Sequence, residues 1–213
     1  MFENILRPVY DRFRTLLPRK ETTCNGVKTR RAHLFDRTTE WPDYEEELLE
    51  TLRTHVSPGD SIVIVGGGWG VSAVTAAERG ASVTVYEPSN EQVERVRETA
   101  VLNDVTESVT VRHAKVGETG KVWGESSASI VSPRNLPECD LLELDCEGAE
   151  LDILRAIIIK PAIIAVEVHP SHGVSEEDVR AVLTDLGYEI TNRVRESQSN
   201  SVVILTGELD SGS

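Results

Sequence analysis

The sequence predicts an α/β fold of the Rossmann-like, doubly wound kind, with a mostly parallel sheet. From Ser61 onward, short β-branched runs alternate with segments of helical periodicity, and parallel strands require crossover helices of this kind. A glycine-rich stretch at residues 66–70 separates the first run from the first helical segment. The last two strand patterns have no helical segment between them, which predicts a C-terminal antiparallel strand pair.

Each element follows from its local pattern. Strands are expected where apolar and β-branched residues form short runs, at residues 61–65, 82–86, 108–113, 139–144 and 162–168. Helices are expected where apolar residues recur every three or four positions, at residues 69–79, 90–102, 149–159 and 175–186. Ser175 is a typical N-cap, and Gly80 and Gly187 end two of the helices. A hairpin of residues 188–194 and 201–206 closes the sheet.

The chain is expected to divide into an N-terminal helical extension, residues 1–55, and a second domain over residues 56–208. Apolar residues recur at helical spacing over residues 1–20, which carry five basic and two acidic side chains. Such a helix could make weak contact with an anionic membrane, although packing of its apolar face on the main domain is the favoured alternative. Residues 20–42 are polar and form a connection with room for an edge strand.

The composition excludes several classes of protein. The 213 residues suffice for one α/β domain, and the net charge of −14 disfavours bulk nucleic-acid binding. No apolar run approaches the roughly 20 residues that span a bilayer, and the start of the chain lacks the apolar core of a signal peptide. Three unpatterned cysteines predict no disulfide framework, which fits a cytoplasmic location. Acidic residues in excess, with arginine far more common than lysine, predict a halophilic source; an ordinary acidic protein is the alternative.

Residues 62–70, Ile-Val-Ile-Val-Gly-Gly-Gly-Trp-Gly, carry the strongest signal for a ligand site. Glycines between a strand and a helix let a ligand approach the backbone, and the start of the helix offers free N–H groups. Glu87 ends the second strand, where a carboxylate can accept hydrogen bonds from both hydroxyls of a ribose. Together they predict an adenosine-containing ligand.

Two glycine patterns compete for the identity of that ligand. Gly66, Gly68 and Gly70 match the tight loop of S-adenosylmethionine enzymes. Gly68, Gly70 and Ala73 match the dinucleotide pattern of an NAD-linked oxidoreductase. A tight turn without a ligand is a third interpretation.

Acidic and histidine side chains follow the next two long strands. Asp145 and Glu147 come after the strand at 139–144, and Glu167 and His169 stand at the end of the next one. Because the carboxyl ends of parallel strands share one edge of the sheet, these side chains are expected to face the same pocket as the glycines.

With these residues in place, the chain resembles class I S-adenosylmethionine-dependent methyltransferases of the FkbM type over about residues 56–206. The resemblance rests on five elements: the loop 66–70, Glu87-Pro88-Ser89, Asn103, the stretch Asp145-Cys-Glu-Gly-Ala-Glu150, and Glu167-Val-His169. It implies that S-adenosylmethionine is the cofactor, bound by Gly66, Gly68, Gly70, Glu87 and Pro88.

The resemblance also implies methyl transfer, typically to an oxygen of a small-molecule or sugar-like hydroxyl. Asp145 is then expected to orient the acceptor, Glu147 to share this role, and His169 to act as the general base. The alternatives are a helix-capping role for Glu147 and a surface charge for Glu150. Asp145, Glu147 and His169 could also hold a divalent metal, although no metal is the main expectation.

Two departures from the family pattern affect the expected function. Ile64 stands where the family has an acid two residues before the loop, and Glu143 stands where lysine is common. A fold that has lost its cofactor and acts as a binding module is therefore an alternative. An RNA methyltransferase is a further alternative, which the overall charge disfavours. The sequence leaves the oligomeric state open.

Overall fold

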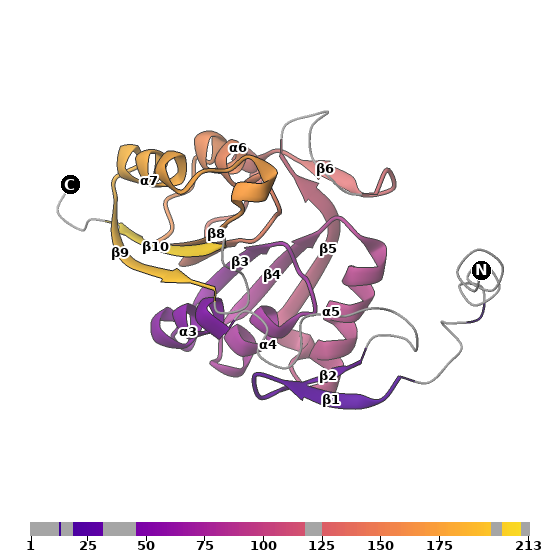
Figure 1. Cartoon of the computed structure of the whole chain (residues 1–213). Coiled ribbons are helices and arrows are strands. Elements are labelled where there is room, and N and C mark those ends of the chain that lie inside the picture. The colour runs from indigo at the N-terminus through magenta and orange to yellow at the C-terminus, as the bar shows by residue number, and fades with distance from the viewer. Residues whose placement is uncertain (1–12, 14–18, 32–45, 118–124, 197–201, 210–213) are drawn as a thin grey trace.

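The computed structural model describes residue 13 and residues 19–31, 46–117, 125–196 and 202–209. An eight-stranded sheet forms its centre, with the strand order β6-β5-β4-β3-β7-β8-β10-β9 (Figure 1). In chain order the strands are β3 (Ser61–Val65), β4 (Ser82–Glu87), β5 (Val109–Val116), β6 (Ser129–Val131), β7 (Leu141–Leu144), β8 (Ile163–Val168), β9 (Tyr188–Arg195) and β10 (Val203–Leu209).

The sheet confirms the predicted fold class. The pairs from β6 to β8 are parallel, and β10 pairs antiparallel with both β8 and β9. The chain moves outward from β3 through β4 and β5 to β6, then returns to the other side of β3 at β7. The strand order therefore reverses between the adjacent strands β3 and β7. In such sheets ligands bind beyond the carboxyl ends of the strands at this point.

Two helical layers cover the sheet (Figure 1). The helices α3 (Glu46–His55), α4 (Val71–Glu78) and α5 (Asn90–Leu102) lie on one face, and α6 (Glu150–Ala156) and α7 (Glu176–Asp185) lie on the other. The alternation of strand side chains supports this arrangement: Ile62 and Ile64 join the buried cluster beneath α4, whereas Val63 and Val65 join the cluster beneath α6 and α7. The expected N-cap of α7 is confirmed, because the Ser175 hydroxyl accepts the N–H of Asp178 at 3.1 Å.

The structure differs from the expectations at several elements. The segment assigned as a polar connection contains a hairpin of its own, β1 (Glu21–Cys24) and β2 (Val27–Arg30), which forms a separate two-stranded sheet rather than an edge of the main one. The short strand β6 was not expected. The helix expected from residue 69 begins at Val71, after the glycine loop, and the one expected from 149 to 159 ends at Ala156.

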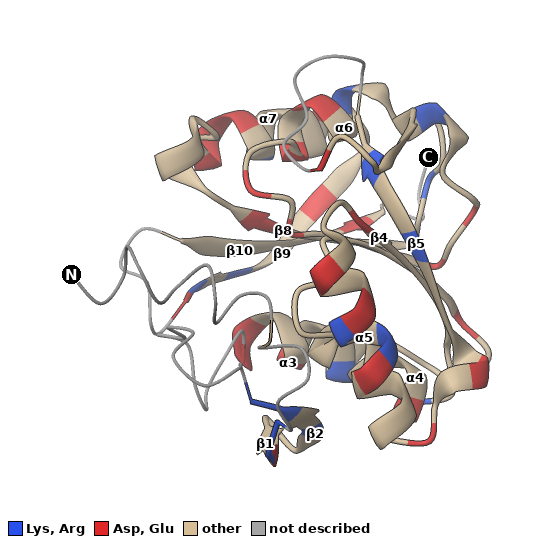
Figure 2. Ribbon diagram, turned by 90° about the vertical axis from the view of Figure 1, so that its right-hand side faces the viewer, with Lys and Arg blue, Asp and Glu red and all other residues tan. Residues whose placement is uncertain are grey.

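The hairpin contacts α5 through β2. Figure 2 shows the hairpin on the outer side of the helices α3, α4 and α5, away from the sheet. The Asn103 side chain accepts the N–H of Lys28 at 3.0 Å and donates to its carbonyl at 2.8 Å. Arg30 forms an ion pair with Glu98 at 3.0 Å. Asn103, one of the residues that carry the resemblance, thus anchors the hairpin to the sheet-covering helices.

The other N-terminal expectations have different outcomes. Helix α3, assigned to the extension, packs on α4 and on β8 and β10 of the sheet. The expected helix over residues 1–20, and with it the membrane contact, lies outside the described residues except for positions 13, 19 and 20. The boundary at residue 55 stays a prediction. No helix within the described ranges is long and apolar enough to cross a membrane. Cys24, Cys139 and Cys146 are free, as expected.

Candidate active site

The glycine loop brings the ends of β3 and β7 into backbone contact. Gly66 has a φ of +103°, and its N–H donates to the Tyr86 carbonyl at 3.0 Å. The N–H of Asp145 donates to the Val65 carbonyl at 2.9 Å. A Cβ on Gly66 would lie 1.7 Å from the carbonyl oxygen of Asp145, so only glycine fits here.

Gly68 and Gly70 of the loop lie in different surroundings. Gly68 lines the pocket described below and has a φ of +47°. Gly70 does not line it: Gly70 precedes α4, and a Cβ there would lie 2.9 Å from the Cα of Val96 in α5. Gly70, expected to bind the cofactor, thus lies at a close contact with α5 and outside the lining of the pocket.

Glu87 holds the loop from the end of β4. Its carboxylate accepts the N–H of Gly67 at 2.8 Å and the N–H of Ser89 at 2.7 Å. Burial raises the pKa of this carboxyl, against the lowering effect of these hydrogen bonds. A carboxylate has about four acceptor positions, so the two backbone bonds leave capacity for a ligand.

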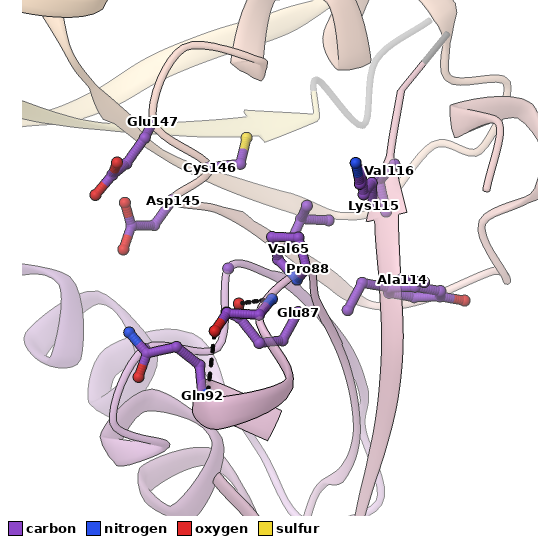
Figure 3. Close-up of a pocket in the computed structure, with 14 residues that line it drawn as sticks. Val65, Glu87, Pro88, Gln92, Ala114, Lys115, Val116, Asp145, Cys146 and Glu147 are labelled. Carbon is purple, nitrogen blue, oxygen red and sulfur yellow. Dashed lines mark hydrogen bonds between the residues drawn. The ribbon is translucent and has the colours of Figure 1, made fainter. Parts of the chain in front are cut away.

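A pocket of about 170 Å³ is lined by the glycine loop, by Glu87 and by the residues that follow β7. Figure 3 shows Glu87, Pro88 and Gln92 on one side and Asp145 and Glu147 on the other. The full lining comprises Val65, Gly66, Gly68, Tyr86, Glu87, Pro88, Ser89, Gln92, Ala114, Lys115, Val116, Asp145, Cys146 and Glu147. The pocket lies at the carboxyl ends of β3 and β7, where the sequence predicted a ligand site.

Glu147 is exposed at the rim of this pocket with a φ of +48°. This left-handed backbone is uncommon for glutamate and often marks functional sites. The alternative of a helix-capping role is wrong, because the N-cap of α6 is Ala149 and no side chain caps that helix.

Behind Asp145 lies a cluster of acidic side chains around His169. The Nδ1 atom of His169 is 3.2 Å from Glu150, while its Nε2 atom is 3.7 Å from Asp145 and 3.5 Å from Glu167. Glu150 is fully buried, and its carboxylate also accepts the N–H of Gly148 at 2.9 Å. The expectation that Glu150 is a surface charge is therefore wrong.

The groups of this cluster shift one another's pKa. Burial raises the pKa of Asp145 to about 7, although His169 counteracts this. Burial by itself would lower the pKa of His169, but the hydrogen bond to Glu150 and the charge of Asp145 raise it above its usual value. Burial tends to raise the pKa of Glu150, yet its bonds to His169 and to backbone N–H groups bring it below its usual value. The residues that could hold a cation here are Asp145, Glu167 and His169, whose donor atoms all lie within 4.8 Å of one another.

The two departures from the family pattern are direct neighbours. Ile64 of β3 and Glu143 of β7 are register partners in the sheet, so their side chains share a face. Both are about 1% exposed, and burial raises the pKa of Glu143 to about 8. The absence of an acid at position 64 is thus accompanied by a buried carboxyl on the adjacent strand.

One protein family matches part of the chain. Residues 127–190 match the model of the methyltransferase FkbM domain. This segment, less than half of the chain, is therefore similar to the FkbM methyltransferase domain. The matched segment includes Asp145, Glu147, Glu150, Glu167 and His169, whereas the glycine loop lies before it. A sequence search of curated proteins gives no match to the chain.

Solved structures extend the comparison to the whole described fold. TYW2 from P. horikoshii, in complex with MeSAdo, is 16% identical with a TM-score of 0.59, covering 89% of this chain and 70% of that one. Magnesium protoporphyrin IX methyltransferase from Synechocystis, with bound SAM, is 15% identical with a TM-score of 0.55, covering 77% of each chain. A SAM-dependent O-methyltransferase from Thermotoga maritima is 15% identical with a TM-score of 0.55, covering 90% of this chain and 78% of that one. At these identities the likeness shows the shared fold alone. The similarity to the FkbM domain is carried by the match over residues 127–190.

Sequence reasoning missed two residues of the site. Glu150 was expected to be a surface charge, and Glu167 was expected to face the pocket but was given no chemical role. Glu150 lies in the first turn of α6, where an acidic side chain is usually exposed to solvent. Only the structure shows that it is buried and that its carboxylate contacts His169. The position of Glu167, near the end of β8 and two residues before His169, was a usable signal, because side chains two apart in extended backbone share a face.

Proposed function

We propose that the protein transfers a methyl group from S-adenosylmethionine to a hydroxyl oxygen of a small-molecule or sugar-like acceptor. One observation supports this most directly: the glycine loop and Glu87 share a single pocket with Asp145 and Glu147. The first two are suited to an adenosine and the last two to a polar acceptor. A cofactor bound between them would have its reactive end next to the acidic cluster.

The lining fits the expected cofactor. The remaining acceptor positions of the Glu87 carboxylate can bind ribose hydroxyls. Pro88, Ala114 and Val116 provide apolar surface for a flat base. The missing side chain at Gly66 keeps the backbone of the loop accessible at the centre of the pocket.

The chemistry is an in-line displacement that the protein aligns. S-adenosylmethionine supplies a sulfonium methyl, so that the acceptor oxygen bonds to the methyl carbon while the carbon–sulfur bond breaks and its electron pair stays on sulfur. Asp145 accepts a hydrogen bond from the acceptor hydroxyl and orients it, with Glu147 beside it. His169, held by Glu150, is the side chain placed to receive the hydroxyl proton on Nε2.

Binding of S-adenosylhomocysteine tests this function. Glu87→Ala removes the carboxylate proposed to bind the ribose hydroxyls, together with two hydrogen bonds to the loop. We therefore expect the affinity of this variant for S-adenosylhomocysteine to fall about 10- to 100-fold. Glu94→Ala, on the exposed side of α5, is the matched control and should bind as the unchanged protein does. Calorimetric titration in high and in low salt measures both, because the acidic composition also predicts better folding at high salt.

The alternatives give different results in the same titration. An NAD-linked oxidoreductase would bind NADH in preference to S-adenosylhomocysteine. A binding module that has lost the cofactor, motivated by Ile64 and Glu143, would bind neither although folded. An RNA methyltransferase would bind S-adenosylhomocysteine and also retain RNA in a salt-dependent manner.

A further inference from the structure

We infer that Asp145, Glu167 and His169 bind one divalent metal ion, which coordinates the acceptor oxygen beside the transferred methyl group. The inference rests on the proposed function for the role of the ion, but not for its binding. It differs from the expected metal-free site, and it replaces Glu147 by Glu167 among the candidate ligands.

The spacing of the donor atoms fits a shared ion. The Nε2 atom of His169 lies 3.5 Å from an oxygen of Glu167 and 3.7 Å from an oxygen of Asp145. Both are contacts of ion-pair length, longer than a typical hydrogen bond. Ligand atoms that each lie about 2.1 Å from one ion are themselves about 3 to 4 Å apart. The donor atoms of the three groups all lie within 4.8 Å of one another, a spacing that one shared ion can bridge.

The orientation of His169 is fixed from behind. Its Nδ1 atom is 3.2 Å from a carboxylate oxygen of Glu150, which is fully buried and is itself held by the N–H of Gly148. A metal-bound histidine usually has such a carboxylate on its second nitrogen, which fixes the ring and leaves the first nitrogen for the ion. The ring of His172 stacks on His169, with centroids 5.7 Å apart, and restricts it further.

The point between the three ligands is within reach of the pocket. Asp145 lines the pocket at the end of β7, and Glu167 and His169 come from the end of the adjacent strand β8. An ion held by these groups has coordination positions left for an oxygen of the acceptor. Bound to the ion, a hydroxyl loses its proton at a lower pH, so the alkoxide is formed by coordination.

The ligand set also indicates which ions fit. Two carboxylates and one imidazole suit hard or borderline cations such as Mn²⁺ or Mg²⁺ rather than thiophilic ones. In the loaded protein His169 is a ligand, and the proton goes to solvent rather than to its Nε2. The acceptor class is then narrowed to compounds whose hydroxyl can coordinate a metal, such as a vicinal diol or a hydroxyl next to a carbonyl.

Titration with Mn²⁺ tests the inference without an acceptor. We expect one site in the unchanged protein, an affinity at least ~10-fold weaker in His169→Ala and in Glu167→Gln, and little change in Glu147→Gln. Glu167→Gln keeps the size of the side chain, so it serves as the measurement if His169→Ala fails to fold. A second readout is the His169 imidazole signal in NMR spectra, which Mn²⁺ should broaden before that of His113.

The outcomes separate this inference from the proposed function. Equal Mn²⁺ binding by all variants, or none by the folded protein, would overturn the metal site, and S-adenosylhomocysteine binding would then leave the His169 base in place. Mn²⁺ binding lost in Glu147→Gln but kept in Glu167→Gln would overturn the ligand set. A protein that binds Mn²⁺ at the three residues but not S-adenosylhomocysteine would retain the metal site and refute the methyl transfer.

Discussion

Replacing Gly66 with alanine is expected to abolish S-adenosylhomocysteine binding and to lower the free energy of unfolding by roughly 3 to 5 kcal/mol. The added Cβ would lie 1.7 Å from the carbonyl oxygen of Asp145, which belongs to the backbone of the neighbouring strand end. Neither partner is the flexible end of a side chain, so the β3 and β7 ends must separate. The pocket between them would change shape as a result.

Gly187→Ala is the matched control for this substitution. Gly187 also has a positive φ, +93°, but nothing lies within 4 Å of a Cβ there. Its substitution should cost only the backbone strain of about 1 to 2 kcal/mol and leave ligand binding unchanged. Thermal and denaturant unfolding with and without S-adenosylhomocysteine measures both variants. Equal losses of stability would show that the strand ends can yield, and would contradict the proposed role of Gly66.

Glu143→Gln is expected to stabilise the protein by a few kcal/mol at pH 8 and by little at pH 5. Glu143 is about 1% exposed, and its Oε2 atom has no hydrogen-bond partner among the residues that the structure describes. Burial raises the pKa of this carboxyl to about 8, from an ordinary value of 4.5. The buried group therefore has to stay protonated, or ionise without a nearby cation, whereas glutamine is neutral at every pH.

The direction of the pH dependence follows from these two values. In the unfolded chain the carboxyl ionises above about pH 4.5, while in the folded protein it keeps its proton up to about pH 8. The stability that the protonated carboxyl contributes is fully present below pH 4.5 and is lost as the pH rises to about 8, at up to about 1.4 kcal/mol per pH unit.

Denaturant unfolding at several pH values measures the difference between Glu143→Gln and the unchanged protein. Exposed Glu138 provides the control, since Glu138→Gln should leave the pH profile as it is. A Glu143→Gln profile that runs parallel to that of the unchanged protein would mean that the carboxyl is ionised in the fold. It would then need a cationic partner, such as the amino group of a bound cofactor.

Much of the fold was predictable because its signals are local. A β-branched run followed by helical periodicity specifies a strand and its crossover helix whatever surrounds them, as at β3 and α4. The hairpin β1–β2 and the strand β6 were missed because each strand has only three or four residues, too few to show a reliable period. They are stabilised by neighbours distant in the chain, such as Asn103 for β2.

The candidate site was predictable only in part. Strand ends with glycines or acids indicate an edge of the sheet, so Gly66, Glu87, Asp145 and Glu147 were correctly expected to meet in one pocket. Gly70 is also part of the glycine pattern, but the rotation of the chain turns it toward α5. A spacing pattern cannot distinguish glycine needed for a ligand from glycine needed for helix packing.

The sequence by itself determined the mostly parallel sheet and the strand ends at which a ligand site was expected. These follow from the order and period of residues along the chain, which local sterics and burial translate directly into elements. Only the tertiary structure decided that Glu150 and Glu167 converge on His169, and that Ile64 and Glu143 are neighbours. Both depend on strand register and side-chain direction, which are set by packing between segments far apart in the chain.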